Sequence, residues 1–224
     1  MSSSTTIHKE EKIESLLISP EEYLRIEELV EVKLEYANGK IIPKEGSEPL
    51  PDWVVRELLK PDFDEKTLDF EFPMATKNHG RLATKISFLL MSQLLDQSFE
   101  VYTQSPSVYI SLTGKYRVPD VTVAHDEERQ LMQDEYLLNP IAIFEVLSPS
   151  TAPKDYSEKL HEYLSIESLQ EYFLVSQDQI RVERFQRVEG ERWEYEVFRE
   201  EILPVSSVEV ELELKEVYKD IFSN

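Results

Sequence analysis

The amino-acid sequence predicts an α/β or α+β fold, in which a mixed β-sheet is flanked by helices. Residues 79–95 and 156–166 carry apolar side chains at helical spacing, whereas most segments around them alternate apolar and polar residues as strands do. The stretch from Ile141 to Leu147 is almost entirely apolar, which is typical of a strand covered on both faces. The order of helix, strands, helix and strands therefore favours a sheet between helices.

Motifs near the N-terminus predict a helix followed by a hairpin. Ser19 is expected to cap a helix that ends near Val30, with Pro20 in its first turn and Glu22 closing a capping box. Asn38-Gly39 is a strong signal for a two-residue hairpin turn, so a strand is expected on either side of it.

The same patterns predict the remaining elements. After a long loop with one helical turn at residues 53–59, Asn78 is expected to cap a long helix, and His79 lies on the apolar face of that helix. Asp155 is expected to cap the second long helix. The other predicted strands are residues 68–72, 100–110, 117–124, 141–147, 172–175, 180–186, 193–198 and 208–214.

Composition excludes several classes of protein. The 224 residues include no cysteine, which rules out disulfides, thiolate zinc sites and a cysteine nucleophile. The 45 acidic and 24 basic side chains give a formal net charge of −21, which repels nucleic acid and anionic membranes at long range. Neither a signal-peptide pattern nor an apolar run of membrane-spanning length occurs. We expect a cytoplasmic protein with no membrane partner, a flexible tail over residues 1–18 and a single domain over 19–224.

Three ionisable residues are predicted to meet at the sheet. Glu145 shares one face of the apolar strand with Ile143 and Leu147, where an unpaired carboxylate needs a proton, a cation or a metal ion. Asp120 lies on the preceding predicted strand, and Lys159 falls within the apolar arc of the following helix. Two carboxylates with an ammonium group nearby predict a Mg²⁺ site.

Five short segments resemble successive signatures of the Uma-type family of endonucleases, a family abundant in cyanobacteria and placed in the PD-(D/E)XK nuclease superfamily. The resemblance runs from about Ser19 to Phe198. The segments are Asn78-His79-Gly80-Arg81, Val118-Pro119-Asp120-Val121, Glu145-Val146-Leu147-Ser148-Pro149-Ser150-Thr151, Asp155-Tyr156-Ser157-Glu158-Lys159 and Leu169-Gln170-Glu171-Tyr172.

The resemblance implies a restriction-endonuclease-like fold and a metal-dependent endonuclease that hydrolyses phosphodiester bonds in DNA. By motif, Asp120 and Glu145 would be metal ligands, with the backbone carbonyl of Val146 as a third. The implied ion is Mg²⁺, with Mn²⁺ as the alternative. It would make the bound water more acidic and neutralise charge that develops on the scissile phosphate.

Two further residues complete the implied catalytic set. The superfamily places a lysine two residues after the glutamate, but this chain has Leu147 there, and Lys159 on the following helix takes the lysine's part. Lys159 would orient the nucleophile or stabilise the developing charge. His79 would contact a phosphate, a metal-bound water or Glu145. The approach to the site would be lined by basic residues: Lys77, Arg81, Lys115, Arg117 and Lys154.

Each of these residues also has a structural interpretation. The two acids could form an ion pair with Lys159 without any metal, or the lysine could extend its ammonium to water. His79 could be a hydrogen-bonded packing residue near a helix start. Glu71 is interpreted as a solvated side chain, with completion of the metal site as the alternative. His125 and His161 fit no ligand pattern and are expected at the surface.

The function therefore has two leading interpretations, a DNA endonuclease and a catalytically inactive module of the same fold that binds nucleic acid or protein. A third is a metal-dependent hydrolase of another phosphate ester. The net charge of −21 fits a binding scaffold for basic proteins better than a grip on DNA. Aromatic residues on the later strands favour packing within the core or in a homodimer, which we expect the chain to form.

Overall fold

The computed structural model describes residues 15–95, 97–126, 130–132 and 136–222, whose strands form two six-stranded sheets and a two-stranded ribbon. The first sheet runs in the order β2 (Lys40–Pro43), β1 (Leu34–Ala37), β5 (Lys115–Arg117), β4 (Ser107–Ile110), β8 (Tyr136–Leu137) and β7 (Leu131–Met132). The second runs in the order β12 (Arg192–Phe198), β11 (Val182–Glu189), β10 (Glu171–Ser176), β9 (Ala142–Leu147), β6 (Val121–His125) and β3 (Phe99–Tyr102). The ribbon pairs β13 (Ile202–Val205) with β14 (Val210–Glu213).

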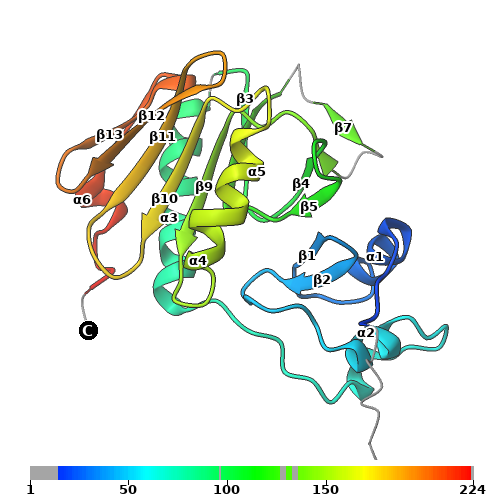
Figure 1. Ribbon diagram of the computed structural model, residues 1–224. Coiled ribbons are helices and arrows are strands. Elements are labelled where there is room, and N and C mark those ends of the chain that lie inside the picture. Colours follow the sequence, from blue (N-terminus) through cyan, green and yellow to red (C-terminus); the bar gives the residue numbers. More distant parts are fainter. Residues whose placement is uncertain (1–14, 96, 127–129, 133–135, 223–224) are drawn as a thin grey trace, which may run out of the picture.

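Helices cover both faces of the second sheet (Figure 1). The α-helices are α1 (Pro20–Glu27), α2 (Asp52–Leu58), α3 (Lys77–Leu94), α4 (Ala152–Lys154), α5 (Leu160–Leu164) and α6 (Leu214–Val217). A π-helical segment, Asp155–Lys159, joins α4 to α5, and the 3₁₀ turns are Glu65–Thr67 and Ser206–Val208. In Figure 1, α3 lies behind the second sheet and α5 lies in front of it, while the β1–β2 hairpin, α1 and α2 gather at the lower right. Among the described residues, no helix is both long and apolar enough to span a membrane.

The apolar stretch that the sequence predicts as a buried strand is β9, inside the second sheet. It pairs in parallel with β10 and antiparallel with β6. Phe144 and Val146 pack in the same core cluster as α3, whereas Ile143 packs in the cluster that holds Tyr163 of α5. Because side chains alternate along a strand, Glu145 faces the α5 side together with Ile143.

The N-terminal hairpin forms as predicted and brings a charged residue into the core. Ser19 and Glu22 make both hydrogen bonds of the capping box. Asn38 and Gly39 both have positive φ, 53° and 76°, which turns β1 directly into β2. Every residue of β1 is buried, including Glu35, because the strand is covered on both faces.

The structure also corrects several predicted elements. Thr76, not Asn78, caps α3, and its side chain accepts a hydrogen bond from the backbone N–H of His79. Asp155 is not the N-cap of a helix, because it follows α4 directly and lies in the π-helical segment. Residues 68–72 form no strand, and Asp120 lies immediately before β6 and not within a strand.

The structure describes only the last four residues of the predicted tail, 15–18. Residues 1–14 lie outside the described residues. The backbone N–H of Leu16 donates to the Asp52 carboxylate at 2.8 Å, and Ile18 is buried. The division into a tail over residues 1–18 and a single domain over 19–224 stays a prediction.

Candidate active site

The acidic pair that the sequence selects lies at the junction of β6 and β9. Val121 is paired with Phe144, so the residue before β6 lies beside the middle of β9. Asp120 and Glu145 are each only 1% exposed. Two carboxylates removed from water in this way need compensating charges or hydrogen bonds, because isolated buried anions are strongly disfavoured.

The Asp120 carboxylate is held from two sides through its Oδ2 atom. His79 Nε2 lies 2.8 Å from Oδ2, and the backbone N–H of Val146 donates to the same oxygen at 2.7 Å. Its Oδ1 atom is buried and accepts no hydrogen bond, although the Lys44 ammonium lies 3.2 Å away. Burial alone would raise the pKa of Asp120, but Lys44 and then His79 outweigh it and hold that pKa below its ordinary value.

The Glu145 carboxylate is surrounded by donors on both oxygens. Lys159 Nζ and the Tyr163 hydroxyl donate to Oε1, each at 3.0 Å, and Lys44 Nζ donates to Oε2 at 2.7 Å. Complete burial nevertheless raises the pKa of Glu145, with the neighbouring Asp120 charge adding to the shift. The pKa values of the two acids are thus driven apart, as is common for groups at active sites.

Lys159 is enclosed by carboxylates and is fully buried, as the helix-face argument predicts. Besides Glu145, its ammonium lies 3.0 Å from Glu35 Oε1 and 3.4 Å from Asp155 Oδ1. Burial favours the neutral amine, but these anions prevail and raise the pKa of Lys159 well above its ordinary value. Lys159 therefore carries a positive charge that does not reach solvent, which excludes the interpretation that its ammonium extends to water.

His79 projects into the site from the first turn of α3. Its ring is buried and bridges two acids, with Nε2 on Asp120 and Nδ1 3.2 Å from Glu45 Oε2. Burial alone would lower the pKa of His79, yet the hydrogen bond to Asp120 and the nearby Glu45 carboxylate raise it to about 10. Among the described residues, His79 makes no hydrogen bond or ion pair with Glu145.

Sequence reasoning missed Lys44, Glu45, Glu35 and Tyr163. Glu35 lies on β1 opposite Ile42, and Lys44 follows β2 directly, at the start of the long loop that the sequence predicts. Polar residues in a short strand and in a loop are usually solvated, and their burial comes from contacts with residues far along the chain: Glu35 with Arg117 and Lys159, and Lys44 with Asp120 and Glu145. Tyr163 lies among apolar residues of its helix, and such a pattern gives no sign of a role for its hydroxyl.

Three of the basic residues expected to line the approach are instead structural. Arg117 is fully buried and donates to Glu162 at 2.7 Å and to Glu35 at 3.1 Å. Lys115 pairs with Glu162 at 2.5 Å, and Lys154 pairs with Glu35. These cations compensate buried acids behind the site, so the prediction that they face a substrate is wrong. Lys77 and Arg81 remain on the outer surface of α3.

Among the described residues, Glu45, His79 and Asp120 have donor atoms within 4.8 Å of one another, a spacing suited to a metal ion. The pair Asp120 and Glu145 offers a second set of hard oxygen donors, of the kind that Mg²⁺ prefers. Nδ1 of His79, which has no hydrogen bond from the described residues, belongs to the first set, and the unbonded Oδ1 of Asp120 could serve in both. The backbone N–H of Val146 donates to Asp120. That the backbone carbonyl of Val146 is a metal ligand stays a prediction.

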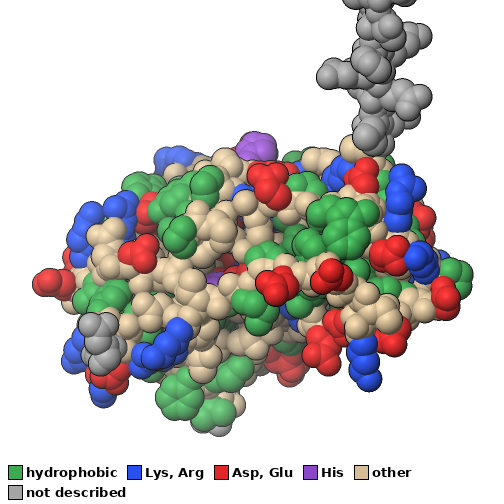
Figure 2. Space-filling model, turned by 90° about the horizontal axis from the view of Figure 1, so that it is seen from below, with side chains coloured by type: hydrophobic (Ala, Val, Ile, Leu, Met, Phe, Trp, Pro, Cys, Tyr) green, Lys and Arg blue, Asp and Glu red, His purple; other side chains and the backbone are tan. Residues whose placement is uncertain are grey.

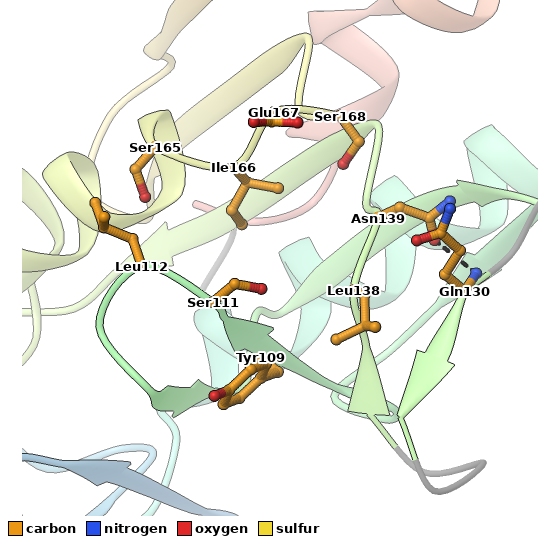
Figure 3. A pocket seen from close by; sticks show the side chains of 10 residues that line it. All are labelled: Tyr109, Ser111, Leu112, Gln130, Leu138, Asn139, Ser165, Ile166, Glu167 and Ser168. Atoms are coloured by element: carbon orange, nitrogen blue, oxygen red, sulfur yellow. Dashed lines mark hydrogen bonds between the residues drawn. The ribbon is translucent and has the colours of Figure 1, made fainter.

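His125, His161 and Glu71 lie outside this cluster. Glu71 and His161 are exposed, and His125 stacks on Phe99 with ring centroids 4.7 Å apart. A separate pocket of about 820 Å³ opens near the N-terminal end of β9 and is lined mainly by hydroxyl, amide and apolar groups (Figure 3). Its lining residues, which include Ser111, Asn139 and Ser168, share no member with the acidic site.

Comparison with known proteins gives concordant findings. A family model described as "Uma2: Putative restriction endonuclease" matches residues 69–215. An uncharacterized protein of Synechocystis is 30% identical over 178 residues, which cover 79% of this chain and 85% of that protein. A second uncharacterized Synechocystis protein is 27% identical over 176 residues, which cover 79% of this chain and 77% of that protein.

A solved structure shares the fold. The crystal structure of a "putative nuclease belonging to DUF820" from Anabaena variabilis has a TM-score of 0.59 with this chain at 20% identity, over 84% of this chain and 91% of that chain. The predicted α+β class, a mixed sheet flanked by helices with a nuclease-like fold, is confirmed.

Proposed function

This chain belongs to the Uma2 family of putative restriction endonucleases, and from that premise we propose that it is a metal-dependent endonuclease that hydrolyses phosphodiester bonds in DNA. The observation that carries the proposal is that Asp120, directly before β6, and Glu145, on the neighbouring strand β9, meet in one buried cluster with Lys44, Lys159 and His79. Fold alone would not assign an activity, so the argument rests on the chemistry of these side chains.

The residues divide into metal ligands and groups that position them. Asp120 and Glu145 would hold Mg²⁺ or Mn²⁺, with His79, Glu45 or the Val146 carbonyl as additional donors. The ion would supply Lewis-acid stabilisation of charge on the scissile phosphate. Lys159 and Tyr163 fix the orientation of Glu145 through its Oε1 atom, and His79 with the Val146 N–H fixes Asp120 through Oδ2. In this proposal Lys159 would also orient the nucleophile or stabilise the developing charge, and His79 would contact a phosphate of the substrate.

The strong acidity makes the divalent ion important for DNA binding as well as for chemistry. On the face seen in Figure 2, acidic and basic side chains are interspersed and no continuous basic stripe is visible. A chain with a net charge of −21 repels the phosphate backbone at long range. Local cations, supplied by bound metal and by Lys77 and Arg81 near the N-terminus of α3, would offset that repulsion.

A plasmid-nicking assay with Mg²⁺, Mn²⁺ or EDTA tests the proposal. The wild-type chain should cleave only with metal, and Asp120→Ala and Glu145→Ala should each lose cleavage by about a hundredfold or more, as loss of a central catalytic interaction typically does. Glu71→Ala removes an exposed acid and should leave cleavage unchanged. Cleavage that persists in both site variants would overturn the proposal, and absence of cleavage in all proteins would favour a binding module of the same fold.

We also propose that the chain forms a homodimer through the outer face of α3. Phe88, Met91 and Leu95 are 67%, 43% and 79% exposed and lie at spacings of three and four residues, so they form one apolar stripe. Such a stripe on a single helix is suited to pairing with its own copy about a two-fold axis.

Charges beside the stripe favour an antiparallel arrangement of the two helices. Lys77 and Arg81 share the face of Phe88 on the N-terminal half of α3. The exposed acids Glu211 and Glu213 flank the C-terminal half, because Gln93 hydrogen-bonds to the Glu211 carbonyl at 3.0 Å. Sedimentation equilibrium should give a dimer mass that Phe88→Glu halves and that Trp53→Glu, at an exposed site elsewhere, leaves intact. A monomeric wild-type chain would refute this arrangement.

A further inference from the structure

Lys44 reaches the candidate active site from a different sheet and is almost fully buried there. It follows β2 directly, its backbone N–H donates to the Lys33 carbonyl at 2.9 Å, and its side chain is 4% exposed. The ammonium lies 3.2 Å from Asp120 Oδ1 and 2.7 Å from Glu145 Oε2. One cation therefore bridges the two carboxylates that would bind the metal.

The oxygen atoms that Lys44 touches are those that no other described side chain uses. Oδ2 of Asp120 is taken by His79 and by the Val146 N–H, and Oε1 of Glu145 is taken by Lys159 and Tyr163. Only Oδ1 and Oε2 remain for a shared cation, and both already face the ammonium of Lys44. Lys44 thus stands where a divalent ion bridging this pair would bind.

A divalent ion and the ammonium cannot share this position. Two positive charges about 4 Å apart repel each other strongly in a buried site, and a doubly charged ion repels the ammonium more strongly than a singly charged one. We propose that Lys44 is the counterion of the metal-free site and that binding of a divalent cation displaces its side chain. The inference rests on the proposed function, because it presumes that Asp120 and Glu145 bind metal.

The structure offers the displaced side chain a place to go. Lys44 and Glu45 line a pocket of about 310 Å³ whose lining also includes Glu31, Lys33 and Gln104. If the Lys44 side chain turned into that pocket, its ammonium would leave the two buried carboxylates and face solvent and the exposed Glu31. The same exchange explains how the two acids can be buried during folding without metal, since Lys44 compensates them until an ion arrives.

Titration calorimetry with Mn²⁺ tests the displacement without reference to cleavage. Lys44→Met should bind Mn²⁺ with a Kd lower by about tenfold or more than that of the wild-type chain, because the competing charge is gone. Lys33→Met removes the same charge from the same pocket but touches neither acid, so its Kd should match the wild type. An unchanged or higher Kd for Lys44→Met would overturn the inference and leave the nuclease proposal standing.

A measurement on the wild-type chain avoids reliance on a variant that fails to fold. Acetylation of amines by an N-hydroxysuccinimide ester, read by peptide mass spectrometry, should modify Lys44 slowly without metal and about tenfold faster with saturating Mn²⁺, with Lys33 as an internal reference. Equal modification of Lys44 in both conditions would overturn displacement. If no Mn²⁺ binds to the wild-type chain, the metal site and the role of Lys44 both fall. Mn²⁺ binding that displaces Lys44 without any DNA cleavage would refute the nuclease proposal alone.

Discussion

At the scale of single residues, the site is a set of buried charges that compensate one another. Glu35, Glu145 and Asp155 surround Lys159, and none of the four side chains is more than 1% exposed. In such a cluster, removing one partner lowers the free energy of unfolding by more than the pair contributes to it, because the remaining charges stay buried without compensation. The same ion pair at the surface contributes little.

Replacing Lys159 tests this difference. Lys159→Met should lower the free energy of unfolding by about 3–5 kcal/mol, because it leaves buried acids uncompensated. Lys60→Met breaks an exposed pair, with Glu57 at 2.6 Å, and should cost less than about 1 kcal/mol. Urea unfolding of both variants measures the two values. Equal, small losses would mean that Lys159 is not needed to hold Glu145.

Glu35 makes the stability of the chain depend on pH. Burial alone would raise the pKa of Glu35, but Lys159, Lys154 and Arg117 hold it well below its ordinary value of 4.5. Since the folded state binds this proton more weakly than the unfolded chain, the stabilisation is present above about pH 4.5 and is lost as the pH falls toward the folded pKa.

Comparison with Glu35→Gln isolates this contribution from other acids. The difference in unfolding free energy between the wild type and Glu35→Gln should be greatest near neutral pH and should shrink as the pH falls below about 4.5. Urea titrations at a series of pH values measure it. A difference that does not vary with pH would contradict the depressed pKa.

At the scale of elements, the hairpin is the feature that brings two charged residues to the site, Glu35 to Lys159 and Lys44 to Asp120 and Glu145. Its turn requires left-handed backbone at both Asn38 and Gly39, and at Gly39 an added Cβ would lie 3.2 Å from the side chain of Leu17. Any shift of this turn would move Glu35 and Lys44, which lie on either side of it.

Two glycine substitutions should therefore have opposite signs. Gly39→Ala should lower the unfolding free energy by about 1–2 kcal/mol, the cost of left-handed backbone for a residue with a Cβ. Gly80→Ala, in the first turns of α3 with open space around its Cα, should raise it by about 0.5–1 kcal/mol. Thermal and urea unfolding would compare them. A neutral Gly39→Ala would show that the turn does not constrain the hairpin.

Most elements could be predicted from the sequence because their signals are local. The capping box at Ser19, the Asn38-Gly39 turn and the apolar stretch of β9 each specify their structure within a few residues. The start of α3 could not be assigned correctly from Asn78 alone, since Thr76 also offers a capping hydroxyl and its position fits the helix.

The candidate site was only half predictable for a different reason. Asp120, Glu145 and Lys159 stand out because they interrupt apolar patterns, and the structure brings them together. Glu35 lies in a short strand and Lys44 at the start of the predicted loop, where polar residues are usually solvated. Their burial depends on contacts with residues far along the chain, which no local pattern encodes.

At the scale of the whole molecule, most of the buried cations that the structure describes lie within or next to one site, although the chain is strongly acidic. Arg117, Lys115 and Lys154 neutralise acids beneath it, while Lys44 and Lys159 contact the central pair. In the proposal above, the exchangeable cation position lies between Asp120 and Glu145, where Lys44 now stands. Binding of a divalent ion at that position is the central claim.

Titration of Mn²⁺ into the wild-type chain and Asp120→Asn tests this claim most directly. The asparagine keeps an oxygen for the Val146 N–H but removes the charge, so its Kd for Mn²⁺ should rise by about tenfold or more. Asp178→Asn makes the same change at an exposed loop position and should bind as the wild type does. The predicted result is one saturable Mn²⁺ site in the wild-type chain and in Asp178→Asn, and weaker binding only in Asp120→Asn. Equal affinity in all three proteins would contradict the account.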